Sequence, residues 1–246
     1  MISVCMATHN GEMFILPQVE SILKQLTYED ELIISDDGST DKTIEIISSL
    51  NDKRISIYKY QQKIIYKNKH KSFYYATKNF ENALKQAKGD IIILSDQDDI
   101  WGNNKVSRIK EELKKYDFIQ SNFSLINDKD EIIMDKVFLK NPLKKNIFLN
   151  IKNSKFFGSS IAFNKCVKEY VLPFPTKLFA HDFWIGTLAC YKFKFLFIDE
   201  PLTKYRKHSN NVSPASGKSN NTFLFKITYR LVFLIQILRK LLHEHK

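Results

Sequence analysis

Short apolar segments alternate with amphipathic segments over the first hundred residues, and this order constrains the fold more than any other feature of the sequence. Short apolar runs indicate strands, and apolar residues at helical spacing indicate helices. The expected strands span 2–7, 31–35, 55–60 and 91–95, and the expected helices between them span 17–26, 44–50 and 72–88. This alternation is typical of a Rossmann-like, doubly wound sheet flanked by helices, so we expect an α/β fold.

The fourth expected strand ends in a cluster of acidic residues. The apolar run 91–94 indicates a strand buried on both faces, and Asp96, Asp98 and Asp99 follow it directly. Ligands of open α/β sheets bind at the carboxyl ends of strands, and clustered carboxylates suit a hard divalent cation. We therefore expect a Mg²⁺ or Mn²⁺ site here, although acidic residues after a strand also form solvated turns or helix caps.

Polar clusters also follow the first and second expected strands. Thr8, His9 and Asn10 follow the first strand, and Asp36 and Asp37 follow the second. A single sheet edge would bring these clusters together with the acidic cluster after the fourth strand. A carboxylate at this edge can accept hydrogen bonds from a nucleobase N–H and from ribose hydroxyls, while the alternative is a turn that caps the next helix.

The second half of the chain predicts elements in a less regular order. They are a helix over 104–116, a hairpin of strands 117–126 and 131–137, a helix over 143–151, a strand over 157–163, a helix that begins near 181 and a last strand over 193–198. We expect Pro201 to close the last strand, because proline donates no hydrogen bond to a sheet.

Several ordered segments resemble a known family. They are Thr8-His9-Asn10, Asp36-Asp37-Gly38-Ser39, Ser95-Asp96-Gln97-Asp98-Asp99-Ile100-Trp101 and Tyr205-Arg206-Lys207-His208-Ser209-Asn210-Asn211. This set resembles family 2 glycosyltransferases, in the form found in rhamnosyltransferase-like bacterial members. The resemblance covers residues 1–212 and implies a GT-A domain there, with a mixed central sheet flanked by helices.

The resemblance also implies roles for individual residues. The residues expected to bind a nucleotide-sugar donor are Thr8, His9, Asn10, Glu12, Asp36, Asp37, Asp96, Gln97 and Arg206. The residues expected to hold the divalent metal, Mg²⁺ or Mn²⁺, are Asp96, Asp98 and His208. In the family this metal lies on the diphosphate of the donor, where it neutralises the charge of the departing nucleotide.

Asp182 matches the catalytic base of the family. The residue before it is usually acidic in the family, and here it is His181. An inverting sugar transfer needs a carboxylate that removes the proton of the acceptor hydroxyl during in-line attack. The alternative from the residues alone is that Asp182 caps a helix that begins before Phe183 and Trp184.

The net charge and the cysteine content limit which partners and which cellular compartment are expected. The formal net charge of +11 favours anionic partners: nucleic acid, an anionic membrane surface or phosphorylated substrates. No recognised nucleic-acid-binding motif appears, so a nucleic-acid partner is not expected. Cys5, Cys166 and Cys190 are too scattered for a disulfide framework or a metal site. With no signal-peptide pattern and no spanning apolar run, we expect a cytoplasmic protein.

The C-terminal part, 213–246, is expected to be separate from the main domain. Residues 209–222 are rich in Ser, Asn and Gly, which is typical of a flexible linker. From 223 to the end, apolar and basic residues alternate as in an amphipathic helix. We expect this helix to lie peripherally on the anionic inner face of the cell membrane. It could instead pack on the core of the protein or form a homodimer.

The function expected from these observations is an inverting glycosyltransferase. It would move a sugar from a nucleoside diphosphate donor to a hydroxyl of a glycan or lipid-linked acceptor, in cell-surface polysaccharide biosynthesis. One alternative is a non-catalytic relative that binds a nucleotide sugar or glycan, for which His181 is the supporting feature. The other is a basic nucleic-acid-binding protein, which the charge alone suggests.

Overall fold

A computed structural model describes residues 1–62, 71–152, 155–208, 211 and 223–243. Its strands are β1 Ile2–Thr8, β2 Glu31–Asp36, β3 Ile55–Lys59, β4 Ile91–Ser95, β5 Ile100–Trp101, β6 Phe118–Ile126, β7 Ile132–Met134, β8 Ile161–Asn164 and β9 Phe195–Arg206. Its helices are α1 Ile15–Leu23, α2 Thr43–Ser49, α3 Lys71–Gln86, α4 Lys105–Glu112, α5 Ile147–Lys152, α6 Lys165–Val171, α7 His181–Lys192 and α8 Phe223–His243, with a 3₁₀ helix η1 at Gly158–Ser160.

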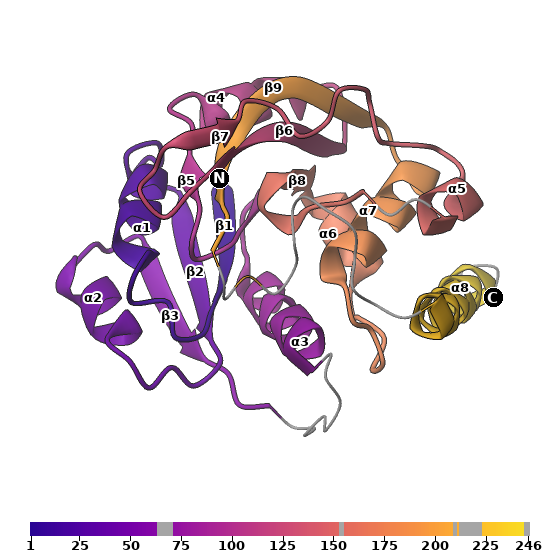
Figure 1. The fold of residues 1–246 in the computed structure, drawn as a ribbon, viewed down its shortest axis with the longest axis horizontal. Coiled ribbons are helices and arrows are strands. Elements are labelled where there is room, and N and C mark those ends of the chain that lie inside the picture. The colour runs from indigo at the N-terminus through magenta and orange to yellow at the C-terminus, as the bar shows by residue number, and fades with distance from the viewer. Residues whose placement is uncertain (63–70, 153–154, 209–210, 212–222, 244–246) are drawn as a thin grey trace.

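The described strands form one mixed sheet, as expected. Their order is β3-β2-β1-β4-β8-β6-β9-β5, and β7 pairs with β6 at one side (Figure 1). β1 runs parallel to both β2 and β4, with Thr8 opposite Asp36 and Met6 opposite Ser95. The register therefore places the carboxyl ends of these three strands at one edge, where their polar clusters meet.

Helices cover both faces of the sheet and give the domain two apolar layers. One cluster lies where α1, α2 and α4 pack on the sheet, and includes Val19, Ile47 and Ile109. The other contains residues of α3, α6 and α7, such as Leu84 and Leu188. Strands buried on both faces explain why β1 and β4 are almost entirely apolar.

Helix α7 is held closely against the elements around it. The Phe156 ring lies so close to Gly186 that a Cβ at this position would be 2.1 Å from its Cδ1, so only glycine fits here. The indole N–H of Trp184 donates to the carbonyl of Val171 at 3.0 Å. These contacts fix the helix that begins with His181.

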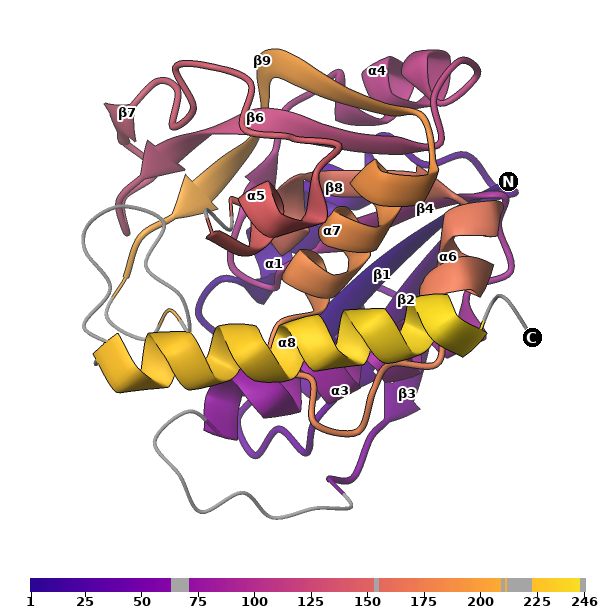
Figure 2. The ribbon, with the colours of Figure 1, turned by 90° about the vertical axis from the view of Figure 1, so that its right-hand side faces the viewer.

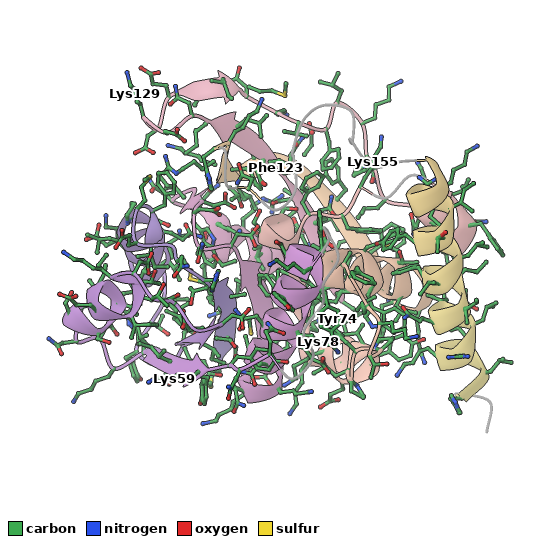
Figure 3. The ribbon with its side chains drawn as sticks, turned by 60° about the horizontal axis from the view of Figure 1, so that its bottom comes forward. Lys59, Tyr74, Lys78, Phe123, Lys129 and Lys155 are labelled. Carbon is green, nitrogen blue, oxygen red and sulfur yellow. The ribbon has the colours of Figure 1, made fainter. Side chains whose placement is uncertain are left out.

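The loop that precedes α7 is attached to α3. The main-chain N–H of Phe174 donates to the Glu81 carboxylate at 3.0 Å, and Lys78 and Lys85 form ion pairs with the same carboxylate. Tyr74 and Lys78 lie next to each other on α3 (Figure 3), with the Lys78 ammonium 6.0 Å from the Tyr74 ring centre. The buried Glu81 is thus satisfied by opposite charges and by the loop.

Helix α8 lies across the α7 side of the molecule (Figure 2). Phe233 and Ile237 face inward and are buried, and the Phe233 ring stacks on Phe183 at 3.9 Å. The structure therefore supports the alternative in which this helix packs on the core. Its outward face is nevertheless apolar, with exposed side chains of Ile227, Leu231, Ile235, Leu238 and Leu242. Within the described residues, no helix is both long and apolar enough to span a membrane.

Several expected boundaries in the second half were wrong. The last strand does not end at Pro201: β9 runs on to Arg206, with Pro201 opposite Asn122 at a shift in register that tolerates proline. The segment expected as a strand over 157–163 begins with η1, and only Ile161–Asn164 is a strand. Helix α6 and the short strand β5 were not expected. The expected linker at 209–222 lies almost wholly outside the described residues, so the division at 212 stays a prediction.

Candidate active site

The turns after β1 and β2 are bound to each other through Asp36. The Asp36 carboxylate is buried, and it accepts hydrogen bonds from the Thr8 hydroxyl at 2.8 Å and from the main-chain N–H of Ser39 at 2.9 Å. The Ser39 hydroxyl also donates to it, at 2.5 Å. The Asp36 carboxylate therefore accepts most of its hydrogen bonds from the protein itself. These bonds hold the two turns of the expected donor-binding edge together.

Asp37 is oriented differently from Asp36. Its carboxylate accepts a hydrogen bond from the Gln62 amide at 2.7 Å, and burial raises its pKa above the ordinary value. The His9 ring lies beside it, with Nδ1 2.9 Å from the Asp37 carbonyl oxygen. The structure thus brings two of the expected donor-binding residues, Asp37 and His9, into contact.

Gln97 connects the turn after β1 to the acidic loop after β4. The His9 N–H donates to Gln97 Oε1 at 2.8 Å, and Gln97 Nε2 donates to the His9 carbonyl at 3.2 Å. A Cβ on Gly11 would be 2.6 Å from Gln97 Oε1, so a larger residue there would have to displace the Gln97 amide. Gln97, expected to bind donor, therefore also has a clear part in shaping the site.

Asn10 and Glu12 lie on the exposed rim and satisfy the start of α2. The Asn10 side-chain oxygen accepts from Thr40 N–H at 2.8 Å, and the Glu12 carboxylate accepts from Lys42 N–H at 2.9 Å. Asp41 accepts from Thr43 N–H at 3.0 Å. These three acceptors bind main-chain N–H groups just before and within the first turn of α2, which the helix itself leaves without partners.

The acidic loop after β4 carries unusual electrostatics. Burial and the neighbouring carboxylates of Asp99 and Asp98 raise the pKa of Asp96. Asp99 is fully buried, and burial together with Asp98 raises its pKa to about 7. Three carboxylates this close repel one another, so the loop attracts a positive group.

Asp98 is paired with His208, although the two are far apart in the sequence. His208 Nε2 lies 2.8 Å from Asp98 Oδ2, and this hydrogen bond raises the pKa of the imidazole. The His208 ring also packs on Phe14, with ring centres 5.1 Å apart. The expected metal ligands Asp98 and His208 are therefore adjacent, and the third expected ligand, Asp96, is near enough for the charge of Asp98 to raise its pKa.

Asp98 and His208 could supply two of the ligands of a divalent cation. Among the described residues, no three His, Cys, Asp or Glu side chains are arranged to hold a metal. Mg²⁺ is commonly held by one or two carboxylates together with substrate phosphates, and Mn²⁺ also accepts imidazole. One carboxylate beside one imidazole at a carboxyl-rich sheet edge suits an ion whose remaining ligands come from a diphosphate and water.

Arg206 is almost fully buried and holds the acidic loop. Its main-chain N–H donates to Asp99 at 3.0 Å, and its Nε donates to the Asp98 carbonyl at 2.9 Å. Its guanidinium also pairs with Asp130 and donates to the Asn127 carbonyl, both in the turn between β6 and β7. Lys129 of the same turn lies at the edge of the molecule (Figure 3). These contacts occupy most of the guanidinium, so phosphate binding by Arg206 stays a prediction.

Asp182 lies in the first turn of α7, near the acidic loop. Burial raises its pKa to about 6, although the Phe183 N–H donates to its carboxylate at 2.7 Å and lowers that pKa. The negative charge of Asp182 is one of those that raise the pKa of Asp96, so the two carboxylates are close enough to repel each other. Asp182 is not the helix cap: Ala180 occupies that position, without a side-chain hydrogen bond.

His181 is neutral and buried beside Asp182. Its ring stacks on Phe80 with centres 4.0 Å apart, and burial lowers its pKa to about 3. Its Nε2 has no hydrogen-bond partner among the described residues, and a Cβ on Gly158 would be 2.9 Å from it. The position therefore holds a neutral ring, in contrast to the acidic residue of the family pattern.

Four residues of the site were not expected from the sequence. Lys105 is fully buried beneath the acidic loop, and Gln18 Nε2 donates to Ser95 Oγ at 2.6 Å and to the Asp96 carbonyl at 3.0 Å. Gln62 donates to the Asp37 carboxylate, and Gly158 lies next to Asp182. For Gln18 a polar residue on the apolar face of an expected helix was the available clue, since buried polar groups are normally hydrogen-bonded.

Comparison with known proteins gives a consistent result. A family model described as Glycosyl transferase family 2 matches residues 3–171. The glucosyltransferase WfaP of Escherichia coli, named as acting between UDP-Glc and alpha-D-GlcNAc-diphosphoundecaprenol, is 31% identical over 216 residues, which cover 87% of this chain and 80% of WfaP.

Two solved structures share the fold. Residues 1–349 of S. aureus TarS, in complex with UDP-GlcNAc, superpose with a TM-score of 0.67 at 18% identity, over 94% of this chain and 65% of that one. The Pyrobaculum calidifontis mannosyltransferase PcManGT, in complex with GDP-Man and Mn²⁺, gives a TM-score of 0.50 at 17% identity, over 81% and 54%. This chain thus spans less than two thirds of either structure.

Proposed function

The chain belongs to family 2 of the glycosyltransferases, and from this premise we propose that it moves a sugar from a nucleoside diphosphate to a hydroxyl of a lipid-linked glycan, with inversion at the anomeric carbon. The observation that carries the proposal is that the acidic loop with the Asp98–His208 pair lies near Asp182 of α7, whose charge helps to raise the pKa of Asp96 in that loop. One group suits the diphosphate and its cation, and the other suits the acceptor hydroxyl.

The donor occupies the edge formed by the turns after β1, β2 and β4. Asp37 and His9 face the nucleoside, while Asp98 and His208 lie where the diphosphate ends. A divalent cation bound there would neutralise charge on the departing nucleoside diphosphate. The protein's own part is to hold the acidic loop still, which Gln97 and Arg206 do through main-chain contacts.

Asp182 acts on the acceptor. An ionised carboxylate accepts the proton of the attacking hydroxyl as the new glycosidic bond forms, and this contribution is typically worth about 10²–10⁴-fold in rate. The raised pKa of about 6 makes the carboxylate a stronger base than an exposed aspartate while leaving it largely ionised at neutral pH. The neighbouring His181 is neutral, and because its pKa is lowered to about 3 it is a poor proton acceptor, so Asp182 is the group that takes the proton.

The acceptor brings the enzyme to the inner face of the cell membrane. The exposed stripe on α8, formed by Ile227, Leu231, Ile235, Leu238 and Leu242, enters the lipid interface, and the basic residues of the helix meet anionic headgroups. WfaP is named for an acceptor on a diphosphoundecaprenol carrier, which is consistent with an acceptor held in a membrane. A homodimer that buries the same stripe is the competing arrangement.

Donor binding is tested with UDP-glucose, UDP-GlcNAc, dTDP-rhamnose and GDP-mannose in a thermal-shift assay. A bound donor raises the melting temperature by mass action, and the rise should be larger with Mn²⁺ than with EDTA. Asp98→Asn should reduce the rise in Mn²⁺ and leave the small rise in EDTA unchanged. Asp90→Asn, an exposed acid remote from the loop, serves as the control. Equal losses in both buffers would exclude a metal role for Asp98.

Membrane attachment is tested by sedimentation with phosphatidylglycerol vesicles. Replacing Leu231 and Leu238 by Glu should abolish co-sedimentation, because charged side chains do not enter the lipid interface. Leu139→Glu changes an exposed leucine elsewhere on the surface and should have no effect. A double variant that still sediments, but changes from dimer to monomer in light scattering, would assign the stripe to a second copy.

A further inference from the structure

A groove with largely apolar walls lies between α8 and the loop that joins α6 to α7. Its volume is about 210 Å³. Leu178 and Phe179 of the loop form one wall, and Tyr229, Val232 and Phe233 of α8 form the other. The loop and the helix can be followed side by side in Figure 2. The mechanism above gives this groove no function.

The size and the walls of the groove suit a piece of hydrocarbon chain. Sites for whole small-molecule ligands usually enclose about 300–1,000 Å³, so a groove of about 210 Å³ is too small for a nucleotide sugar. Phe179 and Val232 are only half-buried, so apolar surface remains that the loop and α8 do not cover themselves. Hydrocarbon placed on this surface is removed from water, which favours its binding.

The groove adjoins the segment that carries Asp182. Phe179, in one wall, precedes Asp182 by three residues, in the stretch that leads directly into α7. Tyr229, in the other wall, contacts Phe183, the residue after Asp182, with ring centres 6.0 Å apart. A ligand bound in the groove is therefore held next to the first turn of α7.

The charge of the groove and its place on α8 indicate the kind of ligand. Lys177 is the only charged residue among the described lining residues, and it is exposed. A lysine ammonium without acidic neighbours in the lining suits a phosphate attached to the hydrocarbon. Val232 is next to Leu231 in the chain and three residues before Ile235, and both belong to the exposed apolar stripe of α8. Groove and stripe are thus neighbours on one helix.

We propose that this groove binds the hydrocarbon chain of the lipid-linked acceptor next to its phosphate, with the Lys177 ammonium on that phosphate. The remainder of the chain stays in the lipid interface that the stripe of α8 meets. The sugar at the other side of the phosphate is then held beside the first turn of α7, where its hydroxyl faces Asp182. The proposal rests on the proposed function in taking the acceptor to be lipid-linked.

The test is the binding of farnesyl diphosphate, a water-soluble isoprenoid diphosphate, to the full chain by isothermal titration calorimetry. EDTA and excess UDP are present throughout, so that the diphosphate of the probe does not occupy the donor edge. Val232→Trp fills the groove with an apolar ring, and Lys177→Gln removes the ammonium. Leu139→Trp and Lys114→Gln make the same kinds of change at exposed residues outside the groove and serve as controls.

The Val232→Trp substitution should raise the Kd of farnesyl diphosphate by at least about tenfold, because losing the burial of two methylene groups already has that effect. Lys177→Gln should raise it by up to about fivefold, as for an exposed ion pair, and this effect should shrink at high salt. Both controls should match the wild type. Co-sedimentation of Val232→Trp with phosphatidylglycerol vesicles should be unchanged, because the stripe is intact.

Three results would overturn the proposal. The first is unchanged binding of the probe by folded Val232→Trp. The second is loss of vesicle binding in this variant, which would assign the groove to membrane phospholipid chains. The third is a change from dimer to monomer in light scattering, which would assign it to a second copy of the chain. If circular dichroism shows that Val232→Trp does not fold, Thr228→Trp, at an exposed residue of the same groove, replaces it.

Transfer assays separate this proposal from the proposed function. Val232→Trp should raise the KM for a lipid-linked acceptor about tenfold and leave kcat and the KM of the donor nearly unchanged. If the wild type transfers sugar and Val232→Trp binds the probe normally, the groove proposal fails and the function stands. If Val232→Trp weakens probe binding but the wild type transfers no sugar, the proposed function fails and the groove stands as a site for an isoprenoid phosphate.

Discussion

The carboxyl group of Asp182 is buried but lies close to main-chain N–H groups, and the balance between these two effects determines its protonation. Burial favours the neutral acid, while neighbouring main-chain N–H groups favour the carboxylate, among them that of Phe183, which donates to it at 2.7 Å. Burial is the larger effect, and the pKa rises to about 6. A base of this strength is ionised at neutral pH and loses its function in mild acid.

This balance predicts the pH dependence of the reaction. Because only the ionised form accepts a proton, kcat/KM should fall below an apparent pKa of about 6, by about tenfold per pH unit. The profile should be measured with saturating Mn²⁺, so that changes in metal loading do not contribute. A profile that stays flat down to pH 4.5 would show that a different group, or none, takes the proton.

The sequence motifs singled out residues that the structure places side by side, but not the residues that support them. Asp98 and His208 were both expected as metal ligands from their motifs, and the structure places them 2.8 Å apart. Lys105 went unnoticed because one lysine among 38 basic residues carries no signal until its burial is known. Arg206 was expected to face a phosphate, and only the three-dimensional structure reveals its contacts with the acidic loop.

At the scale of elements, α8 has two apolar faces with different environments. The outward face includes Leu231, which is 55% exposed, and the other exposed apolar residues named above. The inward face consists of residues such as Phe233 and Ile237, which are buried against α7. Periodicity revealed the helix, but a helix that is apolar nearly all round does not indicate which face meets the protein.

Substitutions on the two faces of α8 should therefore differ in their effect on stability. Phe233→Ala removes a ring stacked on Phe183 and should lower the free energy of unfolding by about 3–5 kcal/mol. Leu231→Ala, on the exposed face, should change it by less than about 0.5 kcal/mol. Urea denaturation monitored by circular dichroism measures both. Similar values for the two variants would mean that α8 is not docked on α7 in solution.

Strand and helix boundaries were most predictable where the chain alternates regularly. In the first hundred residues each expected element is present within a few positions, because short apolar runs and helical spacing were clearly separated. In the second half, β9 passes through Pro201 at a shift in register, which local sequence patterns do not predict. Helix α6 is only seven residues long and buries just Val167 and Val171, too few for a helical period to be recognised in the sequence.

At the scale of the whole molecule, the sheet brings distant segments to one edge. The turn after β1, the turn after β2, the acidic loop after β4 and the end of β9 all meet there, although β9 follows β4 by about a hundred residues. The alternation of strands and helices in the sequence predicted that the first three of these segments would meet, because they follow strands of one parallel sheet. The fourth was expected only through the family motif, because no local pattern places β9 beside the acidic loop.

The central claim is that this edge transfers a sugar and that Asp182 is the base. The most direct measurement is transfer from radiolabelled UDP-glucose to GlcNAc-diphosphoundecaprenol in Mn²⁺, by the wild type and by Asp182→Asn, with UDP binding measured on the same samples. WfaP is named for this donor and acceptor. If the chain does not use UDP-glucose, the donor that raises the melting temperature in the thermal-shift assay replaces it.

Asn has nearly the size of Asp but cannot take the proton, so UDP binding should be unchanged while turnover falls by about 10²–10⁴-fold. An Asp182→Asn variant that binds UDP and keeps turnover near that of the wild type would contradict the account.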